Sequence, residues 1–227
     1  MSAASTAAPR EFPSAPSDVV HALSLWPAAA RDLRRYGELL TAANGSMNLV
    51  GATTLDDFWR RHVLDCGQLA ELAPEARVWV DLGSGAGLPG VVLAILLKGL
   101  SGARVHLVES SVKRSRFLTD VVAELELPAR VETARAENLA IPADVVTARA
   151  CAPLVRLLGF AEGFLRQGAR GLFLKGEGAV GEVAAARKSW RFACETHPSL
   201  SDRRGQILSI TGLTRARPHA RLIGLKP

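Results

Sequence analysis

The chain has few cysteines and no cluster of metal-binding residue types. Its three cysteines, Cys66, Cys151 and Cys194, are far apart in the sequence, and its five histidines are scattered. This pattern matches neither a disulfide framework nor a zinc site. We therefore expect a reducing, cytoplasmic environment and no bound metal, and we interpret Cys151 as a packing residue.

Long hydrophobic runs are also missing. The longest, Val91–Leu97, is far shorter than the roughly 20 apolar residues needed to cross a bilayer, so we expect no membrane-spanning helix. Residues 1–16 are rich in Ala, Ser and Pro and lack the apolar core of a signal peptide. We expect a disordered tail there, with a weak resemblance to a transit peptide as the alternative.

Acidic residues are outnumbered by basic ones. The 28 Lys and Arg residues against 22 Asp and Glu give a formal net charge of +6. Such an excess favours an anionic partner, and nucleic acid is the natural candidate. The Arg- and Ala-rich composition could also reflect coding bias, so charge alone leaves the partner open. A hydrophobic content of 48% in 227 residues predicts one well-packed domain with at most a small accessory element.

The apolar periodicity predicts an α/β fold. Helical spacing covers residues 18–43, a break is predicted at Asn44-Gly45, and a second helix is predicted from Asp56 to Leu72. Farther along, strands and helices alternate. The predicted strands lie near residues 77–82, 104–109, 129–134, 143–148, 169–175, 190–196 and 206–212. The predicted helices lie near residues 89–99, 112–126, 153–165 and 178–188.

Right-handed crossovers between such strands give a doubly wound, mostly parallel, seven-stranded sheet of the Rossmann-like type. No clear helix joins the last two strands, so we expect the final strand to pair antiparallel at the edge of the sheet. The chain then divides into a tail (1–16), an N-terminal helical extension (17–75), the sheet domain (76–213) and a basic C-terminal tail (214–227).

Residues 78–90 carry the strongest functional signal. An apolar run ends in Asp81, a loop with glycines at 83, 85, 87 and 90 follows, and a second apolar run begins directly after it. Strand, glycine loop and helix in this order let a nucleoside cofactor lie against bare backbone. Read from Gly85, the loop also fits a dinucleotide pattern, so its glycines alone do not identify the cofactor.

The acid before the loop favours S-adenosylmethionine. The carboxylate of Asp81 would repel a pyrophosphate, but it suits the ammonium group of a methionine moiety, directly or through water. Glu109 ends the next apolar run, one β-α-β unit later, where an acid can accept hydrogen bonds from both ribose hydroxyls. The alternative for Glu109 is a cap on the helix that starts near Ser111.

Three further positions follow predicted strands. Arg135-Ala136-Glu137 follows the third strand, where loops of this kind of sheet reach the adenine; the alternative is a helix cap or a solvated turn. Arg149 ends the fourth strand and faces the reactive end of the cofactor, where it could position a phosphate or a base. A structural salt bridge from Arg149 to Glu137 or Asp144 is its alternative. Lys175 ends the fifth strand and should point into the same crevice, as a phosphate partner.

A charged strip precedes the sheet. Arg60, Arg61 and His62 form it, with Asp65 one turn farther along the predicted helix. We predict that the three basic residues contact RNA, although such runs are more often a solvated helix face.

Several segments recur, in this order, in one family of enzymes. They are Asn48-Leu49-Val50, Arg61-His62-Val63-Leu64-Asp65, the loop from Asp81 to Gly90, Lys113-Arg114-Ser115-Arg116-Phe117-Leu118, Arg149-Ala150 and Leu174-Lys175-Gly176. On these segments, which span about residues 40–176, the chain resembles the bacterial small-subunit ribosomal RNA guanine-N7 methyltransferases, the glucose-inhibited division protein B (RsmG) family.

The resemblance implies methyl transfer from S-adenosylmethionine to N7 of a guanine in 16S ribosomal RNA, near the decoding centre. It implies that Gly83, Leu88, Ala136, Glu137 and Arg149 line the cofactor pocket and that Glu109 is the ribose acid. The basic C-terminal segment is arranged differently from the family's tail, and the Ala/Ser/Pro start is longer than usual, which puts RNA contacts at both termini in doubt.

The chemistry needs no catalytic base, because guanine N7 has a free lone pair at neutral pH. We therefore assign Arg149 and Lys175 to substrate positioning. A methyltransferase acting on a small molecule or a protein is the main alternative, and a noncatalytic nucleotide-binding or RNA-binding module is the other. We expect a monomer.

Overall fold

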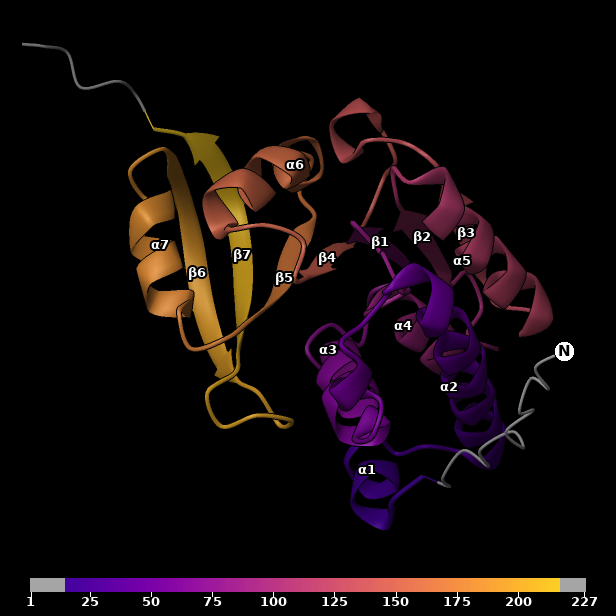
Figure 1. Cartoon of the computed structure of the whole chain (residues 1–227). Coiled ribbons are helices and arrows are strands. Elements are labelled where there is room, and N and C mark those ends of the chain that lie inside the picture. Colours follow the sequence, from indigo (N-terminus) through magenta and orange to yellow (C-terminus); the bar gives the residue numbers. More distant parts are fainter. Residues whose placement is uncertain (1–14, 217–227) are drawn as a thin grey trace, which may run out of the picture.

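The computed structural model describes residues 15–216, which form a seven-stranded sheet with helices on both faces (Figure 1). The strands are β1 (Val78–Leu82), β2 (Arg104–Val108), β3 (Ala129–Glu132), β4 (Val145–Arg149), β5 (Arg170–Lys175), β6 (Trp190–Pro198) and β7 (Gln206–Arg215). Their order in the sheet is β3-β2-β1-β4-β5-β7-β6. The predicted Rossmann-like, doubly wound and mostly parallel sheet is thereby confirmed.

Strands β1 to β5 are parallel, whereas β7 runs antiparallel to both of its neighbours. The antiparallel direction of the last strand is as predicted, but its place at the edge is wrong. β7 lies between β5 and β6, and β6 forms the edge. The short connection between β6 and β7 makes a hairpin, and this hairpin adds to β5 through its second strand.

The helices form two layers. α2 (Pro27–Met47), α3 (Asp65–Glu71), α4 (Gly90–Leu96) and α5 (Val112–Glu124) pack on one face together with the short α1 (Ser17–Ala22). α6 (Leu154–Arg166) and α7 (Ala179–Ala186) pack on the other. Short turns η1 (Ala52–Thr54) and η3 (Ala136–Asn138) and a π-helical segment η2 (Trp59–Leu64) complete the structure.

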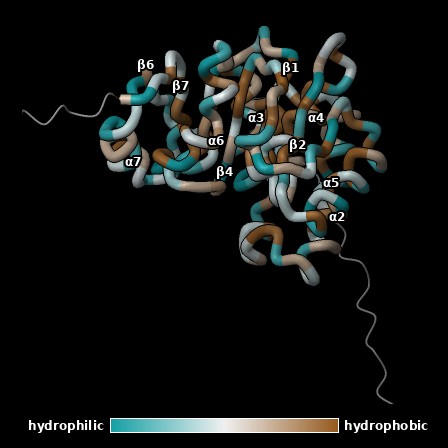
Figure 2. Tube along the Cα trace, turned by 90° about the horizontal axis from the view of Figure 1, so that it is seen from above, coloured by the Kyte–Doolittle hydropathy of each residue, from teal (hydrophilic) through white to brown (hydrophobic). Residues whose placement is uncertain are grey.

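Two cores lie on either side of the sheet because side chains alternate along each strand. In β1, Trp79 belongs to the core under α2 to α5, and Val80 belongs to the core under α6 and α7. Figure 2 shows the hydrophobic parts of the trace gathered where helices meet the central strands. Helices of the N-terminal extension share the first core with the sheet, so this segment packs as part of one unit with it.

The predicted break at Asn44-Gly45 is wrong. The chain interrupts its helical course before Pro27 instead, and α2 then runs through Asn44 to Met47. Proline suits the first turn of a helix, where its missing N–H is not needed. The Asn44 side chain accepts a hydrogen bond from Val50 N at 2.9 Å, and Asn48, with φ of 47°, ends the helix.

The expected tails lie mostly outside the described residues. Positions 1–14 and 217–227 are not described, and Thr214 and Arg215, which we expected in the C-terminal tail, belong to β7. Within residues 15–216 no helix is both long and apolar enough to cross a membrane.

Candidate active site

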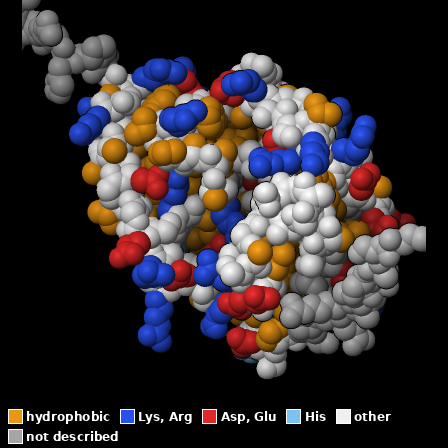
Figure 3. Space-filling view, in the orientation of Figure 1, with side chains coloured by type: hydrophobic (Ala, Val, Ile, Leu, Met, Phe, Trp, Pro, Cys, Tyr) orange, Lys and Arg blue, Asp and Glu red, His pale blue; other side chains and the backbone are white. Residues whose placement is uncertain are grey.

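The candidate site lies at the carboxyl ends of β1, β2, β4 and β5. These strands end beside Asp81, Glu109, Arg149 and Lys175, so parallel pairing brings four predicted residues to one edge of the sheet. A cavity of about 1390 Å³ opens next to this edge. Lys and Arg side chains border a hollow in this face of the molecule (Figure 3).

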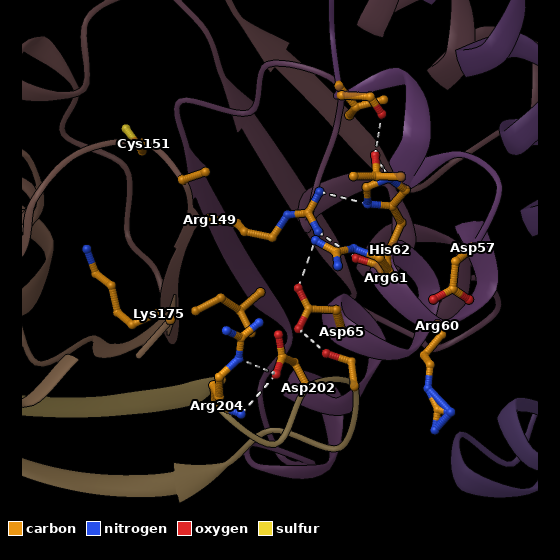
Figure 4. Close-up of a pocket in the computed structure, with 18 of the residues that line it drawn as sticks. Asp57, Arg60, Arg61, His62, Asp65, Arg149, Cys151, Lys175, Asp202 and Arg204 are labelled. Carbon is orange, nitrogen blue, oxygen red and sulfur yellow. Dashed lines mark hydrogen bonds and ion pairs between the residues drawn. The ribbon is translucent and has the colours of Figure 1, made fainter. Parts of the chain in front are cut away.

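Four segments that are distant in sequence line the cavity. They are the stretch from Leu49 to Asp65, residues 149–153 after β4, residues 174–176 with Glu182 of α7, and residues 201–205 between β6 and β7. Figure 4 shows Arg149 near the centre of this arrangement, with Asp65 and His62 beside it and Lys175 on the other side.

The glycine loop is held from two directions. Gly83 has φ of +67°, which L side chains rarely adopt, and a Cβ there would lie 2.6 Å from Cys151 Sγ. Gly85 N donates a hydrogen bond to Glu109 Oε2 at 3.0 Å. From the other side Tyr36, the only tyrosine of the chain, donates from its hydroxyl to Ala86 O at 2.8 Å. The N-terminal extension therefore supports the loop directly.

Asp81 lies fully buried behind the loop. Its Oδ2 accepts a hydrogen bond from Gly90 N at 3.1 Å, at the start of α4. A Cβ on Gly90 would lie 2.7 Å from this oxygen, so glycine is required for the contact. Burial raises the pKa of Asp81 to about 7.

A second oxygen of Asp81 remains available. Among the described residues Oδ1 has no hydrogen-bond partner, and neither has the hydroxyl of Thr147, the register partner of Asp81 on β4. Two buried, unpartnered oxygens side by side at this edge fit a positively charged donor, because a cation would stabilise the carboxylate that burial disfavours. The residues present therefore fit an ammonium-bearing cofactor.

Glu109 is also buried, and both of its oxygens are engaged. Oε2 accepts from Gly85 N, and Oε1 accepts from Ser111 N at 2.8 Å, just before α5. Glu109 is therefore not the surface cap weighed as an alternative, because Ser111 caps α5 with its own side chain. The carboxylate of Glu109 instead fixes the backbone of Ser111 and of the glycine loop. Its role as the ribose acid stays a prediction.

Arg149 forms neither of the salt bridges that were considered for it. Its Nη1 donates to Arg61 O at 2.9 Å and to Asp65 Oδ2 at 3.2 Å. Asp144 instead accepts two backbone hydrogen bonds at the start of β1, from Arg77 N and Val78 N. The guanidinium of Arg149 thus ties the end of β4 to the helix that precedes the sheet.

Ala150 allows the chain to turn sharply after Arg149. Its φ of +50° lies in the left-handed region, which is strained for a residue with a Cβ and is often found at functional sites. This turn sends Arg149 toward Asp65 of α3 (Figure 4). It also brings Cys151 next to Gly83 of the glycine loop. Cys151 is exposed at its contact with Gly83, where we had expected only a packing role.

His62 is not part of an exposed charged strip, contrary to our prediction. The ring is 3% exposed, and its pKa is lowered to about 3 by burial and by the charges of Arg149 and Arg61. Nδ1 accepts from Arg149 Nη2 at 3.0 Å, so the proton sits on Nε2, 3.0 Å from Thr54 Oγ1. Arg60, Arg61 and His62 all line the cavity, and the first two are exposed. Their contact with RNA stays a prediction.

Lys175 reaches the predicted crevice but has a partner there. Its Nζ lies 2.8 Å from both Glu182 Oε2 and Ala152 O, and its side chain is only 9% exposed. The same carboxylate accepts from Leu154 N at 2.6 Å. Glu182, which sequence reasoning missed, therefore links β5, α6 and α7 at the cavity wall.

Of the predicted cofactor residues only Arg149 lines the large cavity, and the others lie outside its lining. Leu88 is buried in the first core. Ala136 and Glu137 form η3 and line a second cavity of about 600 Å³ beside α6. Within residues 15–216 no group of His, Cys, Asp and Glu is arranged to hold a metal ion.

Sequence reasoning also missed the loop of residues 199–205. Its basic pair, Arg203-Arg204, next to Gly205 was a visible signal, but the distance in sequence from every other site residue hid its place. The structure brings Ser201 to Gly205 into the cavity wall.

Comparison with known proteins agrees with this geometry. The sequence model of the family described as rRNA small subunit methyltransferase G matches residues 29–208. A relative from Caulobacter vibrioides with the name "Ribosomal RNA small subunit methyltransferase G" is 56% identical over 190 residues, which cover 84% of this chain and 88% of the relative. One of the same name from Methylorubrum populi is 43% identical over 201 residues, 87% of this chain and 94% of the relative.

Solved structures share the fold. An O-methyltransferase from Bacillus cereus in complex with SAH has a TM-score of 0.55 at 16% identity and covers 80% of this chain and 91% of its own. The O-methyltransferase TomG from Streptomyces achromogenes in complex with SAM has a TM-score of 0.52 at 15% identity. The match covers 86% of this chain and 96% of TomG. At such identities these structures bear on the fold alone, whereas the family model and the relatives cover most of the chain. The chain belongs to the rRNA small subunit methyltransferase G family.

Proposed function

We propose that this protein transfers the methyl group of S-adenosylmethionine to N7 of a guanine in 16S ribosomal RNA. The observation that carries the proposal is its membership of the family over residues 29–208, with 56% identity to a relative of that name. The site supports it, because two buried acids flank a glycine loop at the carboxyl edge of the sheet.

We assign the cofactor to the edge of the sheet formed by the glycine loop and the carboxyl ends of β1, β2 and β4. S-adenosylmethionine, when bound, supplies a methyl group on a sulfonium centre. Asp81 is assigned to its ammonium group and Glu109 to its ribose hydroxyls, while Gly83 and Gly85 allow close approach of the backbone. The resemblance adds Leu88, Ala136, Glu137 and Arg149; the backbone of η3 is the part suited to the adenine edge.

No side chain has to remove a proton in this reaction. The N7 lone pair of guanine forms the new bond as the bond from carbon to sulfur breaks, and orientation can supply about 7–11 kcal/mol in favourable cases. The product base gains positive charge, which backbone carbonyls of the cavity wall can stabilise.

Arg149 and Lys175 act as positioning residues in this proposal. Both cations are engaged with carboxylates, Arg149 with Asp65 and Lys175 with Glu182. These ion pairs fix both side chains in place. We therefore assign them to holding the cavity walls and orienting a nucleotide, and not to proton transfer.

The RNA substrate is assigned to the large cavity and its rim. Arg60 and Arg61 are exposed there, and the chain carries a net charge of +6. Contacts of Lys and Arg with phosphates provide affinity for RNA, and this affinity falls as the salt concentration rises. We further propose that the protein acts as a monomer in the cytoplasm, on 16S ribosomal RNA or on the small ribosomal subunit.

The test is methyl transfer to defined RNA. The purified protein is incubated with S-adenosylmethionine labelled in the methyl group and with 16S ribosomal RNA, or small subunits, from cells that lack this protein. We expect label in one N7-methylguanine, located by cleavage at that base and by mass spectrometry of the fragments. Label in protein or in small molecules, and none in either RNA substrate, would favour the alternative methyltransferase; cofactor binding without any transfer would favour a binding module.

A further inference from the structure

The loop between β6 and β7 is attached to α3, more than 130 residues earlier in the chain. Ser201 Oγ donates to Asp65 Oδ1 at 2.6 Å, and Leu200 N donates to Gln68 Oε1 at 2.8 Å. Gln68 Nε2 also donates to Ser199 Oγ at 3.2 Å. Three successive loop residues are thus bound by two side chains of one short helix.

The loop also closes on itself. Ser199 N donates to Gly205 O at 3.0 Å, and Gly205 N donates to Asp202 O at 2.8 Å. Ser201 N donates to Ser199 Oγ at 3.1 Å. The backbone is therefore fixed before any ligand arrives, and the cost of ordering a loop on binding is reduced.

Asp65 connects this loop to the centre of the site. Its Oδ2 accepts a hydrogen bond from Arg149 Nη1 at 3.2 Å, while its Oδ1 accepts one from Ser201 Oγ. One carboxylate therefore holds the end of β4 and the loop at a fixed distance from each other (Figure 4). A change at either oxygen would shift one wall of the cavity relative to the other.

The loop carries two exposed cations, Arg203 and Arg204, that line the same cavity as Arg60 and Arg61. Arg203 has no carboxylate partner among residues 15–216. Arg204 reaches only two exposed acids, Glu177 at 3.8 Å and Asp202 at 3.7 Å, and such contacts are worth little in water. Both guanidiniums remain available to phosphates.

We propose that the loop of residues 199–205 is the second wall of an RNA cleft and that Arg203 and Arg204 contact the phosphodiester backbone of the substrate. Asp65 is its positioning residue. The proposal rests on the RNA methyltransferase function proposed above. A nucleotide held between two basic walls is fixed in orientation from both sides, as in-line attack on a methyl group requires.

The first experiment removes the loop cations. Binding of 16S ribosomal RNA to the double variant Arg203→Ala/Arg204→Ala is measured by filter retention over a series of salt concentrations. We expect about tenfold weaker binding at low salt, and a slope of log affinity against log salt that is smaller by about 1.4, since each contact to single-stranded nucleic acid contributes about 0.7. The affinity for S-adenosylmethionine, measured by calorimetry, should stay at the wild-type value.

A matched control removes two charges at the opposite edge of the sheet. Arg104 begins β2 and Arg130 lies near the start of β3, and both are exposed. The variant Arg104→Ala/Arg130→Ala loses the same net charge, and we expect it to keep the affinity and salt slope of the wild type within twofold.

The positioning role of Asp65 is tested at its loop side. Ser201→Ala removes the contact to Oδ1 and leaves the pair of Asp65 and Arg149 in place. We expect KM for RNA to rise about fivefold with kcat unchanged, whereas a purely structural role would change only the melting temperature.

The outcomes separate the two proposals. A wild-type protein that fails to methylate 16S ribosomal RNA would overturn the proposed function and the RNA cleft with it. If the wild type is active and Arg203→Ala/Arg204→Ala binds RNA with wild-type affinity and slope, the loop is not a wall of the cleft, and the proposed function stands. A loss equal to that of the charge control would overturn the loop proposal as well.

Discussion

Arg149 Nη2 lies 3.0 Å from His62 Nδ1, so a permanent cation donates to an imidazole that has to stay neutral. The other ring nitrogen lies 3.0 Å from Thr54 Oγ1, whose hydroxyl donates to Gly51 O at 2.6 Å. A chain of hydrogen bonds thus runs from β4 through η2 to η1. Because Leu49, Val50 and Gly51 line the cavity, this chain sets the position of one of its walls.

His62 predicts a specific dependence of stability on pH. Its pKa is about 3 in the folded protein and has the ordinary value of 6.5 in the unfolded chain. Between these values the unfolded chain binds more protons, so stability is fully present above pH 6.5 and is lost as pH falls, by up to about 1.4 kcal/mol per pH unit. Urea unfolding between pH 7 and pH 4 should show a shallower decline for His62→Gln than for the wild type.

The control for this effect is His21→Gln, because His21 is exposed on α1. We expect its decline to parallel that of the wild type. Equal slopes for His62→Gln and the wild type would mean that burial and the neighbouring cations do not keep the ring neutral over this pH range.

Asp81 predicts opposite effects on stability and on cofactor binding. Its pKa is raised to about 7, so the folded protein binds more protons than the unfolded chain, and stability is lost as pH rises from about 4 to 7. Asp81→Asn removes this buried charge and keeps an acceptor for Gly90 N. Relative to the wild type, the variant should gain thermal stability at pH 8 compared with pH 5.

The same variant should bind S-adenosylmethionine more weakly. A hydrogen bond to a charged group is worth about 1.5–3 kcal/mol, so we expect a loss of at least tenfold by calorimetry at pH 8. Wild-type affinity in Asp81→Asn would show that the carboxylate does not face the cofactor.

Gly83 tests the position of the cofactor directly. Gly83→Trp would place an indole at the glycine loop, where we assign the cofactor, and should weaken binding of S-adenosylmethionine at least tenfold. Gly102→Trp is a matched control, since Gly102 also has a positive φ, +77°, but no atom within 4 Å of an added Cβ. Both variants carry backbone strain, and only the first should lose the cofactor in equilibrium dialysis. Unimpaired binding by Gly83→Trp would refute the placement.

Arg60 and Arg61 test the first wall of the RNA cleft. Both are exposed, and Arg60→Ala/Arg61→Ala should lower methyl incorporation into 16S ribosomal RNA about tenfold at subsaturating RNA. The loss should shrink as salt rises, because phosphate contacts are already weakened there. Incorporation equal to that of the wild type at every salt concentration would remove these residues from the interface.

Local patterns predicted the parts of the site that come from consecutive strands. Asp81 and Glu109 each end an apolar run, and parallel pairing of β1 with β2 brings such ends together by geometry alone. The glycines of the loop predicted a backbone that a residue with a Cβ would rarely adopt, and Gly83 has such a backbone, with φ of +67°.

Contacts that depend on packing could not be predicted. Nothing near Asp65 in the sequence indicates Ser201, and Tyr36 gives no sign of its bond to the glycine loop. His62 resembled an exposed member of a basic run, but the π-helical segment η2 turns its ring inward. The place of β7 between β5 and β6 also depends on which strand of the β6–β7 hairpin pairs with β5. The sequence of one strand alone does not determine that choice.

That place of β7 has a consequence for synthesis of the protein. Residues 206–215 leave the ribosome after every other strand, yet β5 pairs with them from Gly171 with Ile210 to Lys175 with Gln206. Until they emerge, the nascent chain presents an open, apolar strand edge, the kind of surface that invites aggregation and chaperone binding. Translation must therefore pass residue 215 before the sheet can close.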